Sequence, residues 1–338
     1  MSAILTEAKF DSWFPNRSNY FTYDSFLRAA AKYPGFCGEA SNGLSEADAC
    51  KREIAALFSH IYHTSNGLSQ LKDPNCATSI SEADCGFKTT GVTSPADSFF
   101  YARGPVGLKT DLEYADFSKA FYEGYDRSAE LLNHPDRVSD DGYVGFTSAL
   151  YKWMVPQKSS PSAHNVMTGF FVPNTSDLGA GHKDGFGTTM LIMNGSICGS
   201  GTRVAAANSL VNKYKSFQAD LGMTADTQNL HCESMWASFS WGGSANKMQY
   251  FTTPAWGTST CQPVAWETVY NAMDRDAYKR CVCESALTET DPACQQESTN
   301  VDPDPTQPDN NDDNNNNDDN NNDNNNNDDN NNDNTTPD

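Results

Sequence analysis

Two histidines, His60 and His63, have a spacing that could serve metal chemistry. They lie one turn apart in a segment, 46–63, whose apolar stripe predicts a helix, so their side chains would share one face. Neutral imidazole nitrogens are common ligands of transition metals. A metal site needs further ligands, and no third one is evident in the sequence. We therefore expect neither a metal centre nor a cofactor in the globular part of the chain.

A second group of potential ligands lies in the C-terminal stretch from Val301 to Asp338. It consists almost entirely of Asn and Asp, with 12 Asp and no Lys, Arg or aromatic residue. Such a segment cannot bury enough apolar surface to offset its ordering entropy, so disorder is predicted. Its oxygens suit hard cations, which suggests weak, multivalent binding of Ca²⁺ or of a mineral surface. An equally good interpretation is a solubilising tail with no ligand.

The charge of the chain is concentrated in this tail. The whole chain carries −21, and the 12 tail aspartates account for −12 of it, which leaves −9 for the remainder. No basic patch indicates nucleic-acid binding, and no apolar run reaches the ~20 residues that would span a bilayer. We expect three parts: a main domain over 1–232, a Trp- and Cys-containing extension over 233–300, and the tail over 301–338.

The chain contains ten cysteines, an even number that predicts disulfides and an oxidising compartment. The N-terminal sequence MSAILTEAKF has neither the basic region nor the apolar stretch of a signal peptide. We give the cysteines more weight and expect a secreted, extracellular protein. Cys37 and Cys50 are paired by proximity, whereas the pairing of Cys261, Cys281, Cys283 and Cys294 stays open.

Helical periodicity dominates the main domain. Helices are predicted over 24–33 with Asp24 as N-cap, 46–63, 113–132, 141–154, 161–171 with Pro161 in the first turn, and 203–221. The stretch 186–194 is apolar, and 66–98 is a long loop rich in Ser, Asn, Asp and Gly. No strand alternation or βαβ rhythm is present, so a mainly α fold is expected.

Several segments of the main domain then resemble family 19 glycoside hydrolases, and they occur in the family's order. The matching segments are Phe14-Pro15-Asn16-Arg17, Lys51-Arg52-Glu53-Ile54-Ala55-Ala56-Leu57-Phe58, Tyr101-Ala102-Arg103-Gly104-Pro105, Leu131-Leu132-Asn133, Trp153-Met154, Pro161-Ser162 with His164, Gly185-Phe186-Gly187, Ile192-Met193-Asn194-Gly195 and Asn229-Leu230 with Cys232. This resemblance implies the family's lysozyme-like helical fold, with chitin as the substrate class. It also implies disulfides between Cys76 and Cys85 and between Cys198 and Cys232.

The resemblance further implies an inverting mechanism, in which one carboxylic acid protonates the leaving oxygen and a second carboxylate activates water. The family's acid belongs to an HET motif just after the KREIAAFF segment, and the base lies in the following loop. Here His63 is assigned to the acid position and Asp73 to the base position. A protonated histidine is a cation that repels a developing oxocarbenium ion. Asp73 is one methylene shorter than glutamate, and a misplacement of ~1 Å can cost ~100-fold in rate.

The positions that hold sugar in the family are also changed. Tyr101, Arg103 and Asn194 are retained, whereas Lys109, Asp111 and Glu113 stand where the family has Ser and two Asn, and Ser209 replaces an Arg. We therefore expect a chitinase-like protein that binds chitin or a related polymer with lost or impaired hydrolysis. Together with the acidic tail, this suggests a chitinous or calcified extracellular matrix as its setting. The alternatives are an active endochitinase and a structural matrix protein that no longer binds sugar.

Other interpretations of single residues stay open at this point. If His63 is an ordinary surface histidine, Glu82 or Glu113 could supply a carboxylate, for example as an acid/base pair of Asp73 with Glu113. Arg103 could form an ion pair within the core. Three tryptophans of the extension could stack on sugar rings or could form its core: Trp236, Trp241 and Trp256.

Overall fold

The computed structural model describes residues 1–78, 85, 87–122, 125–156, 159–235, 238–247, 250–252 and 262–264. These residues belong to one compact unit, Met1–Gln296. The predictions for the tail, for the four late cysteines and for Glu82, Trp236 and Trp256 lie outside the described residues.

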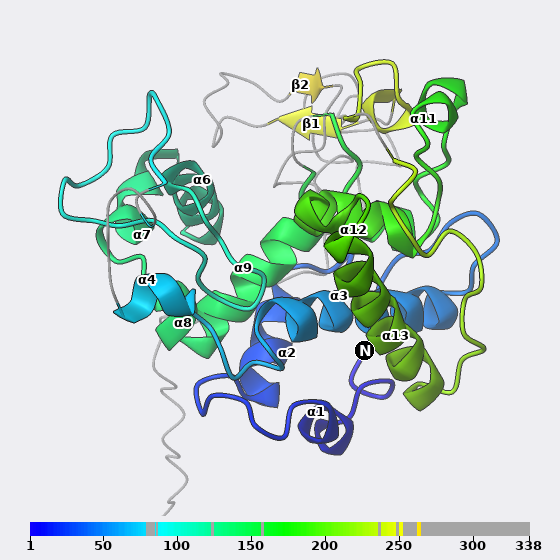
Figure 1. Ribbon diagram of the computed structural model, residues 1–338, viewed down its shortest axis with the longest axis horizontal. Helices are drawn as coiled ribbons and strands as arrows, with labels where there is room; N and C mark the ends of the chain where they lie inside the picture. Colours follow the sequence, from blue (N-terminus) through cyan, green and yellow to red (C-terminus); the bar gives the residue numbers. More distant parts are fainter. Residues whose placement is uncertain are drawn as a thin grey trace, which may run out of the picture. The chain divides into compact units, whose positions relative to one another are not determined.

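Helices form most of the described chain, as the periodicity predicts (Figure 1). In chain order they are α1 (Glu7–Trp13), α2 (Tyr23–Ala31), α3 (Glu46–Thr64), α4 (Pro74–Thr78), α6 (Asp111–Phe121), the 3-10 helix η1 (Tyr125–Ser128), α7 (Ala129–Asn133), α8 (Arg137–Asp140), α9 (Gly142–Met154), α10 (Ala163–Met167), α11 (Thr175–Gly179), α12 (Phe186–Asn194), η2 (Gly195–Ile197), α13 (Thr202–Asp220) and η3 (Ser244–Lys247). The strands β1 (Tyr250–Thr252) and β2 (Gln262–Val264) pair antiparallel.

Polar side chains fix where the longer helices begin. Ser45 accepts the backbone N–H of Asp48 at α3, and the Asp141 carboxylate accepts two N–H groups at the start of α9. Thr110 and Glu113 form a reciprocal capping box at α6. The sequence predicts the starts of α3 and α9 to within one residue, whereas α6 begins two residues before the predicted 113.

Three of the helix predictions need correction. The N-cap of α2 is Thr22, whose hydroxyl accepts the N–H of Ser25, so Asp24 lies inside the first turn. The segment 113–132 is divided into α6, η1 and α7 instead of forming one helix. The segment 161–171 contains only the short α10, because Ser162 is its N-cap and Gly169 adopts a left-handed φ of 86° soon after its end.

The main hydrophobic core surrounds α3, the long helix near the centre of Figure 1. Every residue of α3 from Glu53 to Ile61 is buried, and the helix packs against α10, α12 and α13. Aromatic rings fill the space between α1, α2 and α3, with Phe10, Phe26 and Phe58 in mutual contact. This burial orients α3 so that its C-terminal turn emerges at the edge of the core.

A second, smaller core lies beside the first. It is built by Phe100 and Leu108 of the loop before α6, by Tyr114 and Phe117 of α6, and by residues of α7 to α9. Tyr151 of α9 packs against both cores, so α9 joins them. In Figure 1, α6 and α7 lie to one side of α9 and the end of α3.

The three disulfides expected in the main domain are confirmed: Cys37–Cys50, Cys76–Cys85 and Cys198–Cys232. The second joins Cys76 of α4 to Cys85, and the third joins Cys198, directly after η2, to Cys232 at the end of the main domain. In the described part of the chain, no helix is long and apolar enough to cross a membrane.

Candidate functional site

The C-terminal turn of α3 carries His60, His63 and Thr64. His60 is buried, and its Nε2 lies 3.0 Å from the Thr189 hydroxyl oxygen. Because that hydroxyl donates to the Phe186 carbonyl, it accepts from His60, so Nε2 carries the imidazole proton. Burial lowers the pKa of His60 to about 3. His60 is therefore a neutral, satisfied side chain of the core and is not free to ligate a metal.

His63 and Thr64 lie further along the same turn. His63 is half-buried, and burial of its ring lowers its pKa from the ordinary value. Thr64 is exposed, and its γ-methyl lies 3.5 Å from where a Cβ on Gly107 would be. The end of α3 thus meets the loop that precedes α6, where the family resemblance places the acid and the sugar-binding residues.

An ion pair joins α6 to α9 between the two cores. Nζ of Lys152 lies 3.3 Å from Oε1 of Glu113, and the side chains are only 11% and 24% exposed. Oε2 of Glu113 accepts the backbone N–H groups of Lys109 and Thr110. The Lys152 charge also acts on His60, which places this pair close to α3. Glu113 therefore serves as cap, ion-pair partner and local anion at once.

Asp73 lies in the loop that follows α3 and is partly exposed. Its backbone N–H donates to the Ala102 carbonyl at 2.9 Å, which brings this loop against the segment before α6. Its Oδ1 accepts the N–H of Asn75 at 3.0 Å, and its carbonyl accepts from Cys76 and Ala77 at the start of α4. The carboxylate is thus engaged in starting α4, close to the Cys76–Cys85 disulfide.

Arg103 and Tyr101 are both buried, and they contact each other. The guanidinium carbon of Arg103 lies 3.6 Å from the Tyr101 ring centroid, and its Nε donates to Asp136 at 2.8 Å. Its Nη1 donates to the Phe99 carbonyl at 3.0 Å. With 4% of its side chain exposed, Arg103 holds the loop before α6 onto Asp136. Arg103 therefore forms an ion pair, but its partner Asp136 is 56% exposed, so the pair reaches the surface and is not confined to the core.

The other three sequence-predicted sugar contacts lie in different settings. Asp111 is fully buried, and its Oδ1 accepts the backbone N–H groups of Thr89 and Leu112. Lys109 is exposed, with its ammonium 4.5 Å from the Phe87 ring centroid. Asn194 ends α12 and accepts a hydrogen bond from the Ser196 hydroxyl at 2.5 Å. Lys109 is thus the member of this set with its side chain at the surface near the end of α3.

A buried charge cluster inside the main core is not evident from the sequence. Nδ1 of His164 lies 2.5 Å from Oε1 of Glu53, which is fully buried, and Nε2 lies 3.5 Å from Glu39. Glu53 also accepts from Trp153 Nε1 at 2.9 Å and from the Cys37 backbone N–H at 2.9 Å. Although burial opposes the charged imidazole, Glu53 and Glu39 raise the pKa of His164 to about 10. This cluster connects α3, α9 and α10; Glu53 and His164 are buried, whereas Glu39 is 28% exposed.

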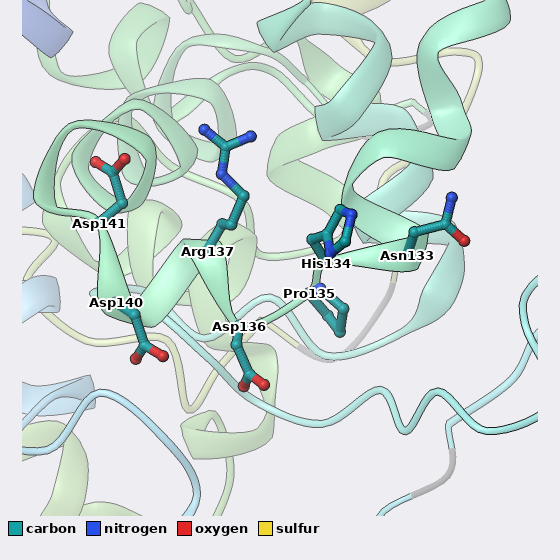
Figure 2. A pocket seen from close by; sticks show the side chains of 7 residues that line it. All are labelled: Asn133, His134, Pro135, Asp136, Arg137, Asp140 and Asp141. Atoms are coloured by element: carbon teal, nitrogen blue, oxygen red, sulfur yellow. The ribbon is translucent and has the colours of Figure 1, made fainter. Parts of the chain in front are cut away.

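An open pocket of about 440 Å³ lies over α7, α8 and the start of α9, lined by Asn133, His134, Pro135, Asp136, Arg137, Asp140 and Asp141. Figure 2 shows Asp136 and Asp140 on one side and the Arg137 side chain directed away from them. Both carboxylates bind Lys72, at 3.2 and 3.1 Å. Arg103 and Lys72 hold the pKa of Asp136 below normal, although burial opposes its ionisation. These ion pairs account for the acidic side chains, and no metal-ligating cluster occurs among the described residues.

The comparisons with known proteins agree with the fold. The sequence profile of glycoside hydrolase family 19, chitinase class I, matches residues 7–232, and the chain belongs to this family. Chitinase 12 of Oryza sativa subsp. japonica is 32% identical over 69% of this chain and 74% of its own length. Inactive chitinase-like protein 2 of Hevea brasiliensis is 30% identical over 68% of each chain. The crystal structure of chitinase C from Streptomyces griseus HUT6037 is similar with a TM-score of 0.55 and 27% identity, covering 68% of this chain and 80% of that one.

Proposed function

We propose that this chain binds chitin, or a related β-1,4-linked N-acetylglucosamine polymer, and that it has lost efficient hydrolysis. One observation supports the loss of hydrolysis in particular. From Ile54 through Lys72 the sequence contains no Asp or Glu, and this stretch includes the whole exposed end of α3. The family resemblance places the general acid here, so no alignment register supplies a carboxylic acid at that position.

Neither residue at the end of α3 can replace that acid well. His63 has a lowered pKa, so near neutral pH its imidazole is uncharged and holds no acidic proton to give. When protonated it is a cation, which destabilises the positive charge of the transition state. A shift of one residue would place Thr64 there, and a threonine hydroxyl is far too weak an acid. Both registers predict a large loss of rate.

The base position is altered less severely. Asp73 keeps a carboxylate, but its side chain is shorter than glutamate and accepts the N–H of Asn75 at 3.0 Å. That bond directs one oxygen toward α4 and reduces its freedom to activate water. A water-activating carboxylate without a proton donor leaves the sugar oxygen as a poor leaving group. The described geometry therefore supports retained binding in preference to retained catalysis.

Sequence similarity supports the binding half of the proposal. The relatives include proteins named as chitinases and proteins named as inactive chitinase-like proteins, at almost the same identity to this chain. The loop before α6 is held in place by Arg103 and Glu113, so the family's sugar-facing surface keeps its scaffold although individual side chains differ. Lys109, Lys152 and Glu113 are charged residues on or near that surface, and we include them in the binding site.

Calorimetric titration of the full chain with the soluble N-acetylglucosamine hexamer tests binding. We expect saturable binding that weakens in Lys109→Ala and is unchanged in Asp140→Asn, whose side chain belongs to the open pocket over α7 and α8. A second titration, followed by NMR, detects binding that releases no heat. The absence of both heat and chemical shift changes at millimolar hexamer would contradict the proposal. Restoration of hydrolysis is the complementary test. It uses His63→Glu or Thr64→Glu, each combined with Asp73→Glu.

The competing function is an active endochitinase with a rearranged acid/base pair. Its best support is Glu113, a partly buried carboxylate near the end of α3, together with Asp73. This reading requires the Lys152–Glu113 ion pair to open so that the carboxyl group can take up a proton. Hydrolysis that disappears in both Asp73→Asn and Glu113→Gln would establish it.

We further propose that the protein is extracellular and that its acidic tail meets Ca²⁺ or a mineral surface within a chitinous matrix. Three disulfides in the described domain favour an oxidising compartment. The 12 tail aspartates supply the oxygens for weak cation binding. A calcium titration of the full chain, beside a chain with all 12 changed to Asn, tests this role. Identical titration curves for the two chains at millimolar Ca²⁺ would exclude calcium binding by the tail.

A further inference from the structure

Trp241 is the most exposed large apolar side chain among the described residues, at 69%. It follows Ser240 and precedes Gly242 and Gly243, in the turn that begins the extension beyond the main domain. An indole exposed to this degree offers a partner a large apolar surface, because aromatic side chains carry the largest apolar areas. The position of Trp241 therefore calls for a functional explanation.

The turn that presents Trp241 is fixed to α11 by hydrogen bonds on both sides of the indole. Nδ2 of Asn174 donates to the Gly242 carbonyl at 2.9 Å, and the hydroxyls of Ser176 and Ser240 lie 3.2 Å apart. The backbone N–H of Ser244 donates to the buried Asp177 carboxylate at 2.9 Å. A side chain on a fixed turn loses little backbone entropy on binding, which is the physical basis of preorganisation.

The surroundings of Trp241 are neutral and rich in hydrogen-bonding groups. The two contacting segments, 172–178 and 238–243, contain no Lys or Arg, and their single acidic residue, Asp177, is buried. The exposed polar groups are hydroxyls, amides and backbone of Ser, Thr, Asn and Gly. Two further exposed apolar side chains belong to the first segment, Val172 at 57% and Leu178 of α11 at 54% exposure.

This chemistry discriminates between classes of partner. Binding to a membrane surface would require basic residues beside the apolar ones, and the two segments have none. A stable protein interface buries about 800 Å² on each partner, which a single indole and one or two aliphatic side chains do not supply. A neutral polysaccharide matches the patch, because sugar C–H faces stack on aromatic rings and sugar hydroxyls pair with neutral hydrogen-bonding groups.

We propose that Trp241 and the turn around it form a second polysaccharide contact, separate from the end of α3, on which a strand of insoluble chitin stacks. Figure 1 shows α11 on the opposite side of the view from α6 and α7. The choice of chitin as the polysaccharide rests on the proposed function. The contact raises affinity for the solid polymer by a second attachment point, as expected for linked binding sites.

The test compares Trp241→Ala with Trp241→Tyr in the full chain. Tyr20→Ala is the matched control, since Tyr20 is an aromatic side chain with 62% exposure before α2. Binding to insoluble chitin is measured by depletion, and binding to the soluble N-acetylglucosamine tetramer by calorimetry. We expect Trp241→Ala to weaken binding to insoluble chitin about two- to tenfold, the range for loss of one aromatic stack. Tetramer binding stays unchanged, and Trp241→Tyr keeps most of the affinity.

The possible outcomes separate this contact from the proposed site at α3. Insoluble-chitin binding that is equal in Trp241→Ala and the parent chain excludes stacking, and an equal loss in Trp241→Tyr assigns the residue a packing role. A change in sedimentation of Trp241→Ala would identify the patch as a contact between two copies of the chain. A parent chain that binds the solid through Trp241 but not the tetramer supports this contact and removes the proposed site at α3. A parent chain that binds neither insoluble chitin nor the tetramer would exclude both the Trp241 contact and the proposed site at α3.

Discussion

Replacing Glu53 with Gln tests how strongly the buried charge cluster between α3, α9 and α10 stabilises the fold. Glu53 is fully buried in α3, and its carboxylate contacts His164 at 2.5 Å, Trp153 Nε1 at 2.9 Å and the Cys37 N–H at 2.9 Å. Gln has the same shape and keeps one oxygen acceptor for Trp153. It removes the negative charge and turns the second acceptor into a donor facing Cys37.

The expected loss follows from leaving a buried imidazolium without its main partner. Removing one partner of a buried ion pair typically costs about 3–5 kcal/mol, and we expect Glu53→Gln to fall in that range. Glu39→Gln is the matched control, because Glu39 lies 3.5 Å from His164 and is 28% exposed. A partly exposed pair of this kind contributes below about 1 kcal/mol. Urea denaturation at pH 6.5 measures the free energy of unfolding of each variant.

The pH dependence provides an independent check on the same cluster. The pKa of His164 is about 10 in the folded chain and about 6.5 when unfolded. The folded state therefore holds the proton more tightly, so the stabilisation is complete below pH 6.5 and is lost as the pH rises toward 10. The difference in unfolding free energy between the parent chain and Glu53→Gln should narrow over that window. A loss below about 1 kcal/mol at pH 6.5, or a difference that stays constant to pH 10, would refute the reasoning.

Three further predictions concern single positions. His60 has a pKa of about 3 in the folded chain, so the fold requires its neutral form. The parent chain should therefore lose at most about 1.4 kcal/mol of stability per pH unit as the pH falls from 6.5 toward 3. In acid denaturation, the stability of His60→Gln should fall less steeply with pH. Asp111→Asn weakens the hydrogen bond from the Thr89 N–H and should lower the free energy of unfolding, measured in urea, by about 1–3 kcal/mol. Segment 87–98 should then be cleaved faster by proteases. Equal cleavage rates would show that Asp111 does not hold this segment in place. Gly187→Ala should destabilise by about 1–3 kcal/mol although alanine favours helices, because its Cβ would lie 2.3 Å from the His231 carbonyl; a raised melting temperature would contradict this.

Much of the fold could be predicted from local sequence. The apolar stripe predicts α3 almost to the residue, and the predicted helix 141–154 matches α9 to within one residue. These features are local, since a cap or stripe depends on residues within a few turns. The division of 113–132 depends instead on contacts across the chain, because the Ser118 hydroxyl donates to the Arg127 carbonyl and accepts from the Leu131 N–H. Periodicity contains no information about such a contact.

The candidate site could be predicted only in part, for a similar reason. Residue type identified Asp73 and Glu113 as carboxylates of interest, but burial and pairing determine what each can do. Nothing in the spacing indicates that Lys152, 39 residues after Glu113, forms an ion pair with it at 3.3 Å. The buried Glu53–His164 contact spans 111 residues and was equally invisible. Long-range electrostatics of this kind requires the folded structure.

The central claim is that hydrolysis was lost with the acid at the end of α3, and the most direct test is cleavage of the N-acetylglucosamine hexamer by the full chain. Product is measured by chromatography between pH 4 and pH 8. We predict no product above the rate of the buffer at any pH, from a chain that still binds the hexamer. Cleavage with inversion at the anomeric carbon, lost in Asp73→Asn, would contradict the account and define an active enzyme.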